Sequence, residues 1–76
     1  MNEVEWINEF GENLKRMMLD ARMTQRELSD LSGLSEATIS RYLNKTMAPS
    51  GKAIVNLAYA LGCDTDDLID FGCTIK

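Results

Sequence analysis

Histidine is absent from this chain of 76 residues, and cysteine occurs only twice, as Cys63 and Cys73. Structural zinc sites need closely spaced Cys or His ligands, and the common nucleophilic catalytic pairs need a neighbouring base such as histidine. We therefore expect no metal site, no cofactor and no catalytic residue, so the protein is predicted not to be an enzyme. Free thiols with no export signal predict a cytoplasmic location.

Long hydrophobic runs are also missing. No stretch reaches the roughly 18 apolar residues that suggest a membrane-spanning helix, so we expect no membrane association. The N-terminal segment MNEVEWINEF is acidic and interrupted by charges, which is not the pattern of a signal peptide. With 45% hydrophobic residues and no linker or repeat, residues 1–76 are predicted to form a single small domain.

The balance of charge is acidic, with a net charge of −4, which at first argues against nucleic-acid binding. The acidic residues nevertheless gather at the two ends, four within residues 1–12 and four within 64–70, where no basic residue occurs. Residues 14–52 hold seven basic and four acidic residues, a net charge of +3. The middle of the chain therefore remains compatible with a polyanionic partner.

A short helix is predicted after Thr24, whose hydroxyl is a good N-cap. Glu27 stands three residues later and completes a capping box. Leu28 and Leu31 are spaced to lie on one helical face and are expected to point inward. Gly33 then ends the helix, because glycine adopts the left-handed conformation readily, and we expect it to have a positive φ.

A second short helix is predicted to begin after Ser35, which is again a suitable N-cap. Ile39, Tyr42 and Leu43 recur at helical spacing and form its apolar side. Two short helices joined by a tight glycine turn are typical of a helix-turn-helix, here spanning residues 25–44.

Three further helices are predicted around this unit. The first covers about residues 3–22, with an apolar stripe of Trp6, Ile7, Phe10, Leu14, Met17, Met18 and Ala21. Gly11 is placed on its polar side. The fourth covers residues 52–61 between a Ser50 cap and Gly62, and the fifth runs from a cap at Asp64 to about residue 70, with Leu68 and Ile69 inward. Cys63 is expected to be buried and unreactive. The predicted fold is an all-α, compact five-helix domain.

The segment resembles the helix-turn-helix of the Xre/Cro, or lambda-repressor-like, family of DNA-binding regulators. The family pattern has Gln at the start of the first helix, a small residue four later, Gly in the turn and a β-branched residue in the second helix. Gln25, Ser29, Gly33 and Ile39 occupy these places, with Ser29 where alanine is commoner. The resemblance covers about residues 14–68 and implies a lambda-repressor-like fold. It also implies that residues 3–9 extend the first helix beyond its usual start.

The resemblance implies that the helix at about residues 35–43 reads operator DNA in the major groove. Its outward positions would contact bases or phosphates: Ser35, Glu36, Ala37, Thr38, Ser40, Arg41 and Asn44. Arg41 suits guanine and Ala37 a thymine methyl group. Glu36 has two interpretations, an acceptor for the cytosine amine or an acid favoured in any first helical turn.

Other residues are expected to bind phosphates and to position the protein without reading sequence. By the resemblance, Gln25 does so at the start of the first helix of the unit, where free N–H groups attract anions. Arg26 and Lys45 are further candidates. Lys45 is equally well explained as an ordinary loop lysine.

The predicted function is that of a sequence-specific transcriptional regulator of phage or prokaryotic type, acting as a repressor on double-stranded, palindromic operator DNA. The alternative is a protein–protein interaction module on a helix-turn-helix scaffold with weak or no DNA binding. A weak homodimer is expected, because one short helix contacts few base pairs. Its surface would include Val55 and Tyr59, with Tyr59 at least partly exposed, or the apolar tail at residues 71–75.

Overall fold

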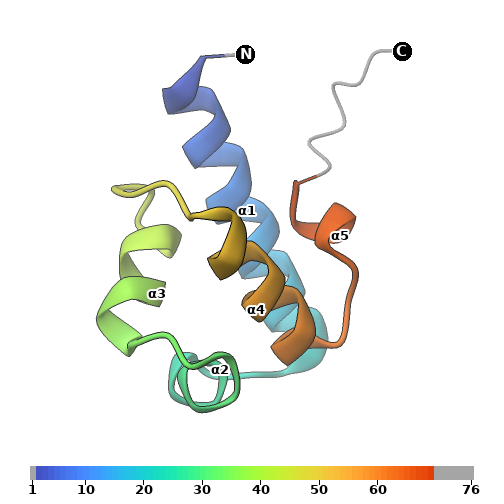
Figure 1. Cartoon of the computed structure of the whole chain (residues 1–76). Coiled ribbons are helices and arrows are strands. Elements are labelled where there is room, and N and C mark those ends of the chain that lie inside the picture. The colour runs from blue at the N-terminus through green and yellow to red at the C-terminus, as the bar shows by residue number, and fades with distance from the viewer. Residues whose placement is uncertain (1, 70–76) are drawn as a thin grey trace.

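The computed structural model describes residues 2–69, which form five α-helices (Figure 1). They are α1 (Glu3–Ala21), α2 (Gln25–Ser32), α3 (Glu36–Leu43), α4 (Gly51–Leu61) and α5 (Thr65–Ile69). The predicted all-α, five-helix fold is confirmed. The predicted role of the tail at residues 71–75 lies outside the described residues. Within residues 2–69, no helix combines the length and the apolar character needed to cross a membrane.

Side-chain caps fix where the helices begin. The Thr24 hydroxyl accepts from the N–H of Glu27 at 3.1 Å, and the Glu27 carboxylate accepts from the N–H of Thr24 at 2.9 Å, so the predicted capping box is present. Ser35 and Ser50 each accept a backbone N–H three residues later at 3.1 Å. These contacts satisfy N–H groups that a helix cannot pair internally.

Left-handed residues fix where α1, α2 and α4 end. Gly33 closes α2 with a φ of 78° and Gly62 closes α4 with a φ of 71°, as the sequence predicted. Arg22 closes α1 with a φ of 54°. This conformation lets the closing N–H groups turn back onto carbonyls of the last helical turn.

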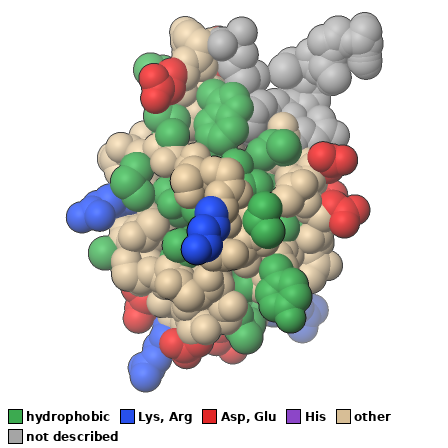
Figure 2. All heavy atoms as spheres, in the orientation of Figure 1, with side chains coloured by type: hydrophobic (Ala, Val, Ile, Leu, Met, Phe, Trp, Pro, Cys, Tyr) green, Lys and Arg blue, Asp and Glu red, His purple; other side chains and the backbone are tan. Residues whose placement is uncertain are grey.

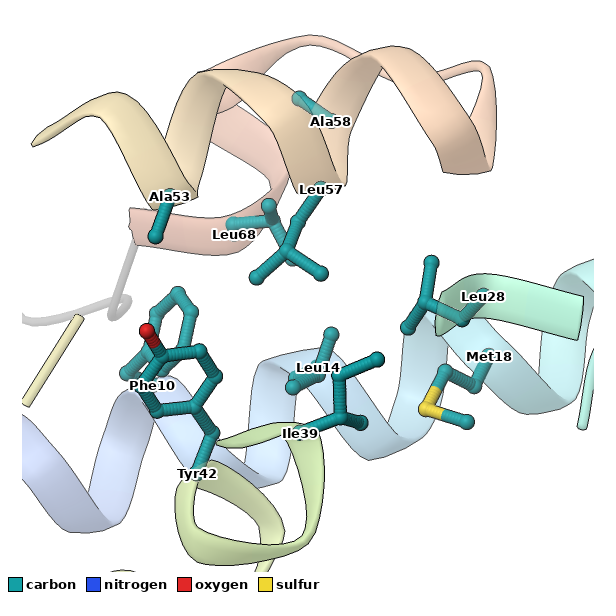
Figure 3. Close-up of a cluster of buried hydrophobic side chains, with 10 residues drawn as sticks. All are labelled: Phe10, Leu14, Met18, Leu28, Ile39, Tyr42, Ala53, Leu57, Ala58 and Leu68. Carbon is teal, nitrogen blue, oxygen red and sulfur yellow. The ribbon is translucent and has the colours of Figure 1, made fainter. Parts of the chain in front are cut away.

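The core lies where the five helices meet (Figure 3). Every helix supplies at least one completely buried side chain: Phe10, Leu14, Leu28, Ile39, Leu57 and Leu68. In Figure 1, α4 crosses in front of the long α1, with α3 and α5 on either side. The core therefore joins the helix-turn-helix of α2 and α3 to the scaffold made by the other three helices.

Three aromatic rings connect α1 to α3 inside this core. Trp6 stacks on Phe10 with ring centroids 5.8 Å apart, and Phe10 meets Tyr42 edge to face at the same distance. Edge-to-face and stacked pairs are the favoured aromatic geometries. Tyr42 is thus anchored from the α1 side, and burial raises the pKa of its phenol.

Three residues predicted to face inward are exposed instead: Ala21, Leu31 and Ile69. Leu31 is 58% exposed, because α2 turns Leu28 and Ser32 to the core and leaves Leu31 at the edge of that face. Ile69 is 38% exposed, because it lies about 100° around α5 from the buried Leu68.

The predicted polar setting of Gly11 is also wrong, because Gly11 is buried beneath the end of α3. A Cβ at this position would lie 2.8 Å from the carbonyl oxygen of Tyr42 and 2.9 Å from Cγ of Lys45. Cys63, predicted to be buried, is half-buried at the turn after α4. Burial, and secondarily Asp67 and Asp64, raise the pKa of its thiol.

Candidate nucleic-acid interface

The two sides of α3 differ in the way that a reading helix requires. Ile39 and Tyr42 are buried against the scaffold. The opposite side carries the exposed residues Glu36, Ala37, Arg41 and Asn44. Their spacing of one, four and three residues places them on one continuous outer face. A helix that is packed on one side and free on the other can enter the major groove.

Arg41 is the cation at the centre of this outer face. Its side chain is exposed, and it makes no ion pair with any residue from 2 to 69. Its carbonyl accepts from both the N–H and the hydroxyl of Thr46, at 3.0 and 3.2 Å. The backbone of the last turn is therefore held in place while the guanidinium stays available for a bidentate contact.

The hydroxyl-bearing positions at the start of α3 are already organised. The Ser35 hydroxyl accepts from the N–H of Thr38 and donates to the Thr38 hydroxyl at 2.9 Å. Asn44 donates from its side chain to the Ser40 hydroxyl at 3.3 Å. Thr38 and Ser40 are half-buried, so they lie at the margins of the outer face.

The N-terminus of α2 offers a second set of donors. Gln25 and Arg26 are exposed at its first two positions. The capping box uses the N–H groups of Thr24 and Glu27, whereas those of Gln25 and Arg26 have no hydrogen-bond partner within the described residues. Free N–H groups at a helix start attract phosphate.

Lys45 differs from the other predicted site residues, because its charge is already paired. Its ammonium forms an ion pair with the carboxylate of Glu12 on α1. This contact, first as a hydrogen bond and then as an attraction between charges, lowers the pKa of Glu12. Lys45 follows the Asn44 cap of α3 with a φ of 63°, and its N–H donates to the carbonyl of Tyr42 at 3.1 Å.

Every predicted site residue thus lies on α2, on α3 or in the cap and turn residues that flank α3, at Ser35, Asn44 and Lys45. Analysis of the sequence missed Glu12, which reaches this region from 33 residues away. Its position on a helix rich in glutamates gave no local signal. A search for an acid on α1 opposite the residue that follows α3 could have found the pair only once the packing of these helices was known.

Comparison with known families decides the class of the protein. The family model of the Cro/C1-type HTH DNA-binding domain matches residues 13–73, most of the chain. The chain belongs to this family. The predicted resemblance is confirmed, and the Cro/C1-type domain accounts for the capped, glycine-hinged pair α2 and α3. A comparison with curated proteins gives no match.

A solved structure supports the same assignment. The Cro/C1-type domain of this chain is similar to the restriction-modification controller protein C.AhdI from Aeromonas hydrophila. The two are 26% identical with a TM-score of 0.78, and the match covers 82% of this chain and 94% of that chain. The similarity therefore extends over almost the whole of the other protein and includes the scaffold helices as well as the helix-turn-helix.

Proposed function

We propose that the protein is a sequence-specific transcriptional regulator that represses by occupying operator DNA with α3. The observation that carries the proposal is the exposed guanidinium of Arg41, which has no ion-pair partner among residues 2–69, on the outer face of a helix whose inner face is packed into the core. A bidentate arginine contact to guanine is the commonest specific contact in the major groove. The similarity to a protein described as a restriction-modification controller supports a regulatory role.

Phosphate contacts would position α3 in the groove. Gln25 is exposed at the start of α2, where the N–H groups of Gln25 and Arg26 have no partner within the described residues. Together with Arg26 they would clamp the DNA backbone on one side of the reading helix. The hydroxyl of Thr38 and the amide of Asn44 lie at the two ends of α3, where they can reach the backbone as well.

We further propose that the regulator binds a palindromic operator as a weak homodimer. An eight-residue helix is only about 12 Å long and contacts few base pairs. A pair of such helices about one DNA turn apart, roughly 34 Å, would read two half-sites. The dimer surface must therefore lie away from α3.

The surface of α4 is suited to this contact. Hydrophobic side chains gather over α4 on the face shown in Figure 2. The large exposed ones on this helix are Val55, 56% exposed, and Tyr59, 85% exposed, one turn apart. Exposed aromatic residues of this kind are enriched at protein interfaces. The predicted exposure of Tyr59 is confirmed, whereas its role in a dimer is part of the proposal.

A salt titration tests the proposed DNA binding. The affinity for a random-sequence duplex should fall linearly with salt on logarithmic axes, because bound phosphates release counterions. Selection from a random DNA pool should then yield a repeated, inverted motif. Binding that is absent, or independent of salt, would favour the protein–protein interaction module instead.

Sedimentation tests the dimer. The full chain and a Tyr59→Ala variant are compared with and without a duplex that holds two half-sites. We expect the Tyr59→Ala variant to lose self-association. The control Leu19→Ala, which removes a 68% exposed leucine from α1, should keep it. One-to-one binding by every variant would remove the dimer from the proposal.

A further inference from the structure

The residue after α3 is held to α1 through both its backbone and its side chain. Lys45 has a left-handed φ of 63°, and its N–H closes the last turn of α3 on the carbonyl of Tyr42 at 3.1 Å. Its side-chain stem crosses the buried Gly11, where Cγ would lie 2.9 Å from any added Cβ. A Cβ at position 11 would force the Tyr42 carbonyl or this stem to shift, so glycine leaves room for Lys45 to reach α1 between the two helices.

At the end of this stem, the Lys45 ammonium forms an ion pair with the carboxylate of Glu12. Both groups keep contact with solvent, with side chains 34% exposed for Lys45 and 57% for Glu12. The hydrogen bond and the charge of Lys45 lower the pKa of Glu12, and the ion pair places two opposite charges side by side. Lys15 and Arg16, on the next turn of α1, also face Glu12 but lower its pKa less than Lys45 does.

The position of the Lys45–Glu12 pair affects how the protein could contact the phosphate backbone of DNA. The C-terminal end of a recognition helix and the chain beyond it lie beside the phosphate backbone when the helix occupies the major groove. A lysine there would add one phosphate contact to every sequence alike, because phosphate contacts carry no sequence information. A phosphate that recruits Lys45 competes with the Glu12 carboxylate, which already supplies a charge-assisted hydrogen bond.

We propose that Glu12 is a positioning residue that holds the Lys45 ammonium away from the DNA backbone and so limits nonspecific affinity. The inference rests on the proposed DNA binding of α3 and deepens it. Arg41 stays unpaired within the described residues and serves sequence recognition, while the neighbouring cation that would serve any sequence is neutralised within the protein. Because the withheld phosphate contact would serve every sequence alike, its absence lowers the affinity for random DNA and for the operator together.

The test measures nonspecific binding of the full chain to a random duplex of about 20 base pairs over a range of salt concentrations. Four proteins are compared: the parent, Glu12→Gln, the control Glu9→Gln, and the double variant Glu12→Gln with Lys45→Gln. Glu9 is an exposed acid on the same helix that makes no ion pair within residues 2–69, so both single variants change the net charge equally. Glutamine at position 45 keeps a long stem over Gly11.

Glu12→Gln should steepen the slope of log affinity against log salt by about 0.9, the value of one added phosphate contact. At about 0.1 M salt this corresponds to roughly five- to tenfold tighter nonspecific binding. Glu9→Gln should keep the parent slope, and the double variant should return to it. Urea unfolding of all four proteins shows that the compared species are folded.

Two results would overturn the inference while leaving the proposed function intact. The first is a Glu12→Gln slope equal to that of Glu9→Gln, which means that the carboxylate restrains no cation. The second is a double variant that keeps the steeper slope, which means that the gain does not pass through Lys45. A parent protein with no salt-dependent binding would instead remove the proposed function, and this inference with it.

Discussion

The side-chain amide of Asn13 donates from Nδ2 to the carbonyl oxygen of Leu68 at 2.9 Å, linking α1 to α5 across 55 residues of sequence. Asn13 is only 3% exposed, and its Oδ1 accepts from the Arg16 guanidinium at 2.7 Å. A buried amide with both ends bonded stabilises one particular approach of two helices. The shortest helix of the fold is thus held by a polar contact as well as by its one buried leucine.

Replacement of Asn13 by alanine should therefore destabilise the domain. The Leu68 carbonyl would be left buried without its donor, which costs about 1–3 kcal/mol in the free energy of unfolding. Urea unfolding followed by circular dichroism measures the change. The control is Asn8→Ala, at an exposed position of the same helix, which should change stability by no more than about 0.5 kcal/mol. Equal midpoints for the two variants would contradict a structural role for the amide.

Gly11→Ala should lower stability even though alanine favours helices. The added Cβ would meet the Tyr42 carbonyl oxygen at 2.8 Å, and backbone cannot move aside cheaply. Overpacking costs about 1–3 kcal/mol, against about 1 kcal/mol gained in helix propensity. Gly51→Ala is the matched control, because nothing lies within 4 Å of its added Cβ. Thermal unfolding should rank Gly51→Ala at or above the parent and Gly11→Ala below it.

Gly33→Val should destabilise the whole domain and not only DNA binding. The hinge has a φ of 78°, where a β-branched residue is strained by at least about 1–2 kcal/mol. There is open space around it, so the effect arises from the backbone alone. Gly33→Asn should recover much of the loss, because asparagine tolerates this conformation. Unchanged melting of Gly33→Val would show that strain at the hinge is negligible.

Arg41→Ala should weaken binding to the selected operator by about 1–3 kcal/mol and relax discrimination at one base pair. Gln25→Ala is the comparison, because a phosphate contact should weaken specific and random duplexes alike. Competition binding on a panel of single-base operator variants separates the two behaviours. Uniform weakening by Arg41→Ala would reassign Arg41 to the DNA backbone.

The Cys63 thiol should react slowly with alkylating reagents in the folded protein. Burial is the main cause that raises its pKa above the ordinary value of 9.0, and Asp67 and then Asp64 add to the shift. The thiolate is the reactive form, so the midpoint of the rate against pH should lie above 9.0 in a Cys73→Ser background. In denaturant the midpoint should return toward the ordinary value. At a pH between these two midpoints, Cys63 is protonated in the folded protein and ionised in the unfolded protein. The contribution of Cys63 to the free energy of unfolding therefore declines as the pH rises through this range.

The parts of the fold that could be predicted from sequence are those specified by neighbouring residues. The capping box of Thr24 and Glu27, the cap at Ser35 and the hinge at Gly33 involve residues at most three positions apart or a single backbone preference. The helical spacing of the apolar residues Ile39 and Tyr42 predicted which side of α3 is buried, and hence which side is exposed. Whether the predicted outward residues touch DNA stays a prediction.

The rest depended on how the helices pack. Helical spacing alone did not reveal that α2 turns Ser32 inward and leaves Leu31 outside. The contacts of Asn13 with Leu68 and of Glu12 with Lys45 join residues that are 55 and 33 positions apart. Polar pairs of this kind follow from the approach of two helices and leave no periodic signal in the chain.

The core that α3 shares with the other helices also means that α3 would not be stable as an isolated helix. Eight residues fall below the roughly 12–15 that an isolated helix needs to persist in water. The outer face of α3 therefore keeps its shape only while α3 packs on the core. That core includes Phe10, Leu57 and Leu68, which lie on three other helices and are completely buried. A genetic screen for loss of operator binding should consequently recover core substitutions throughout the chain, distinguished from changes at Arg41 by their temperature sensitivity.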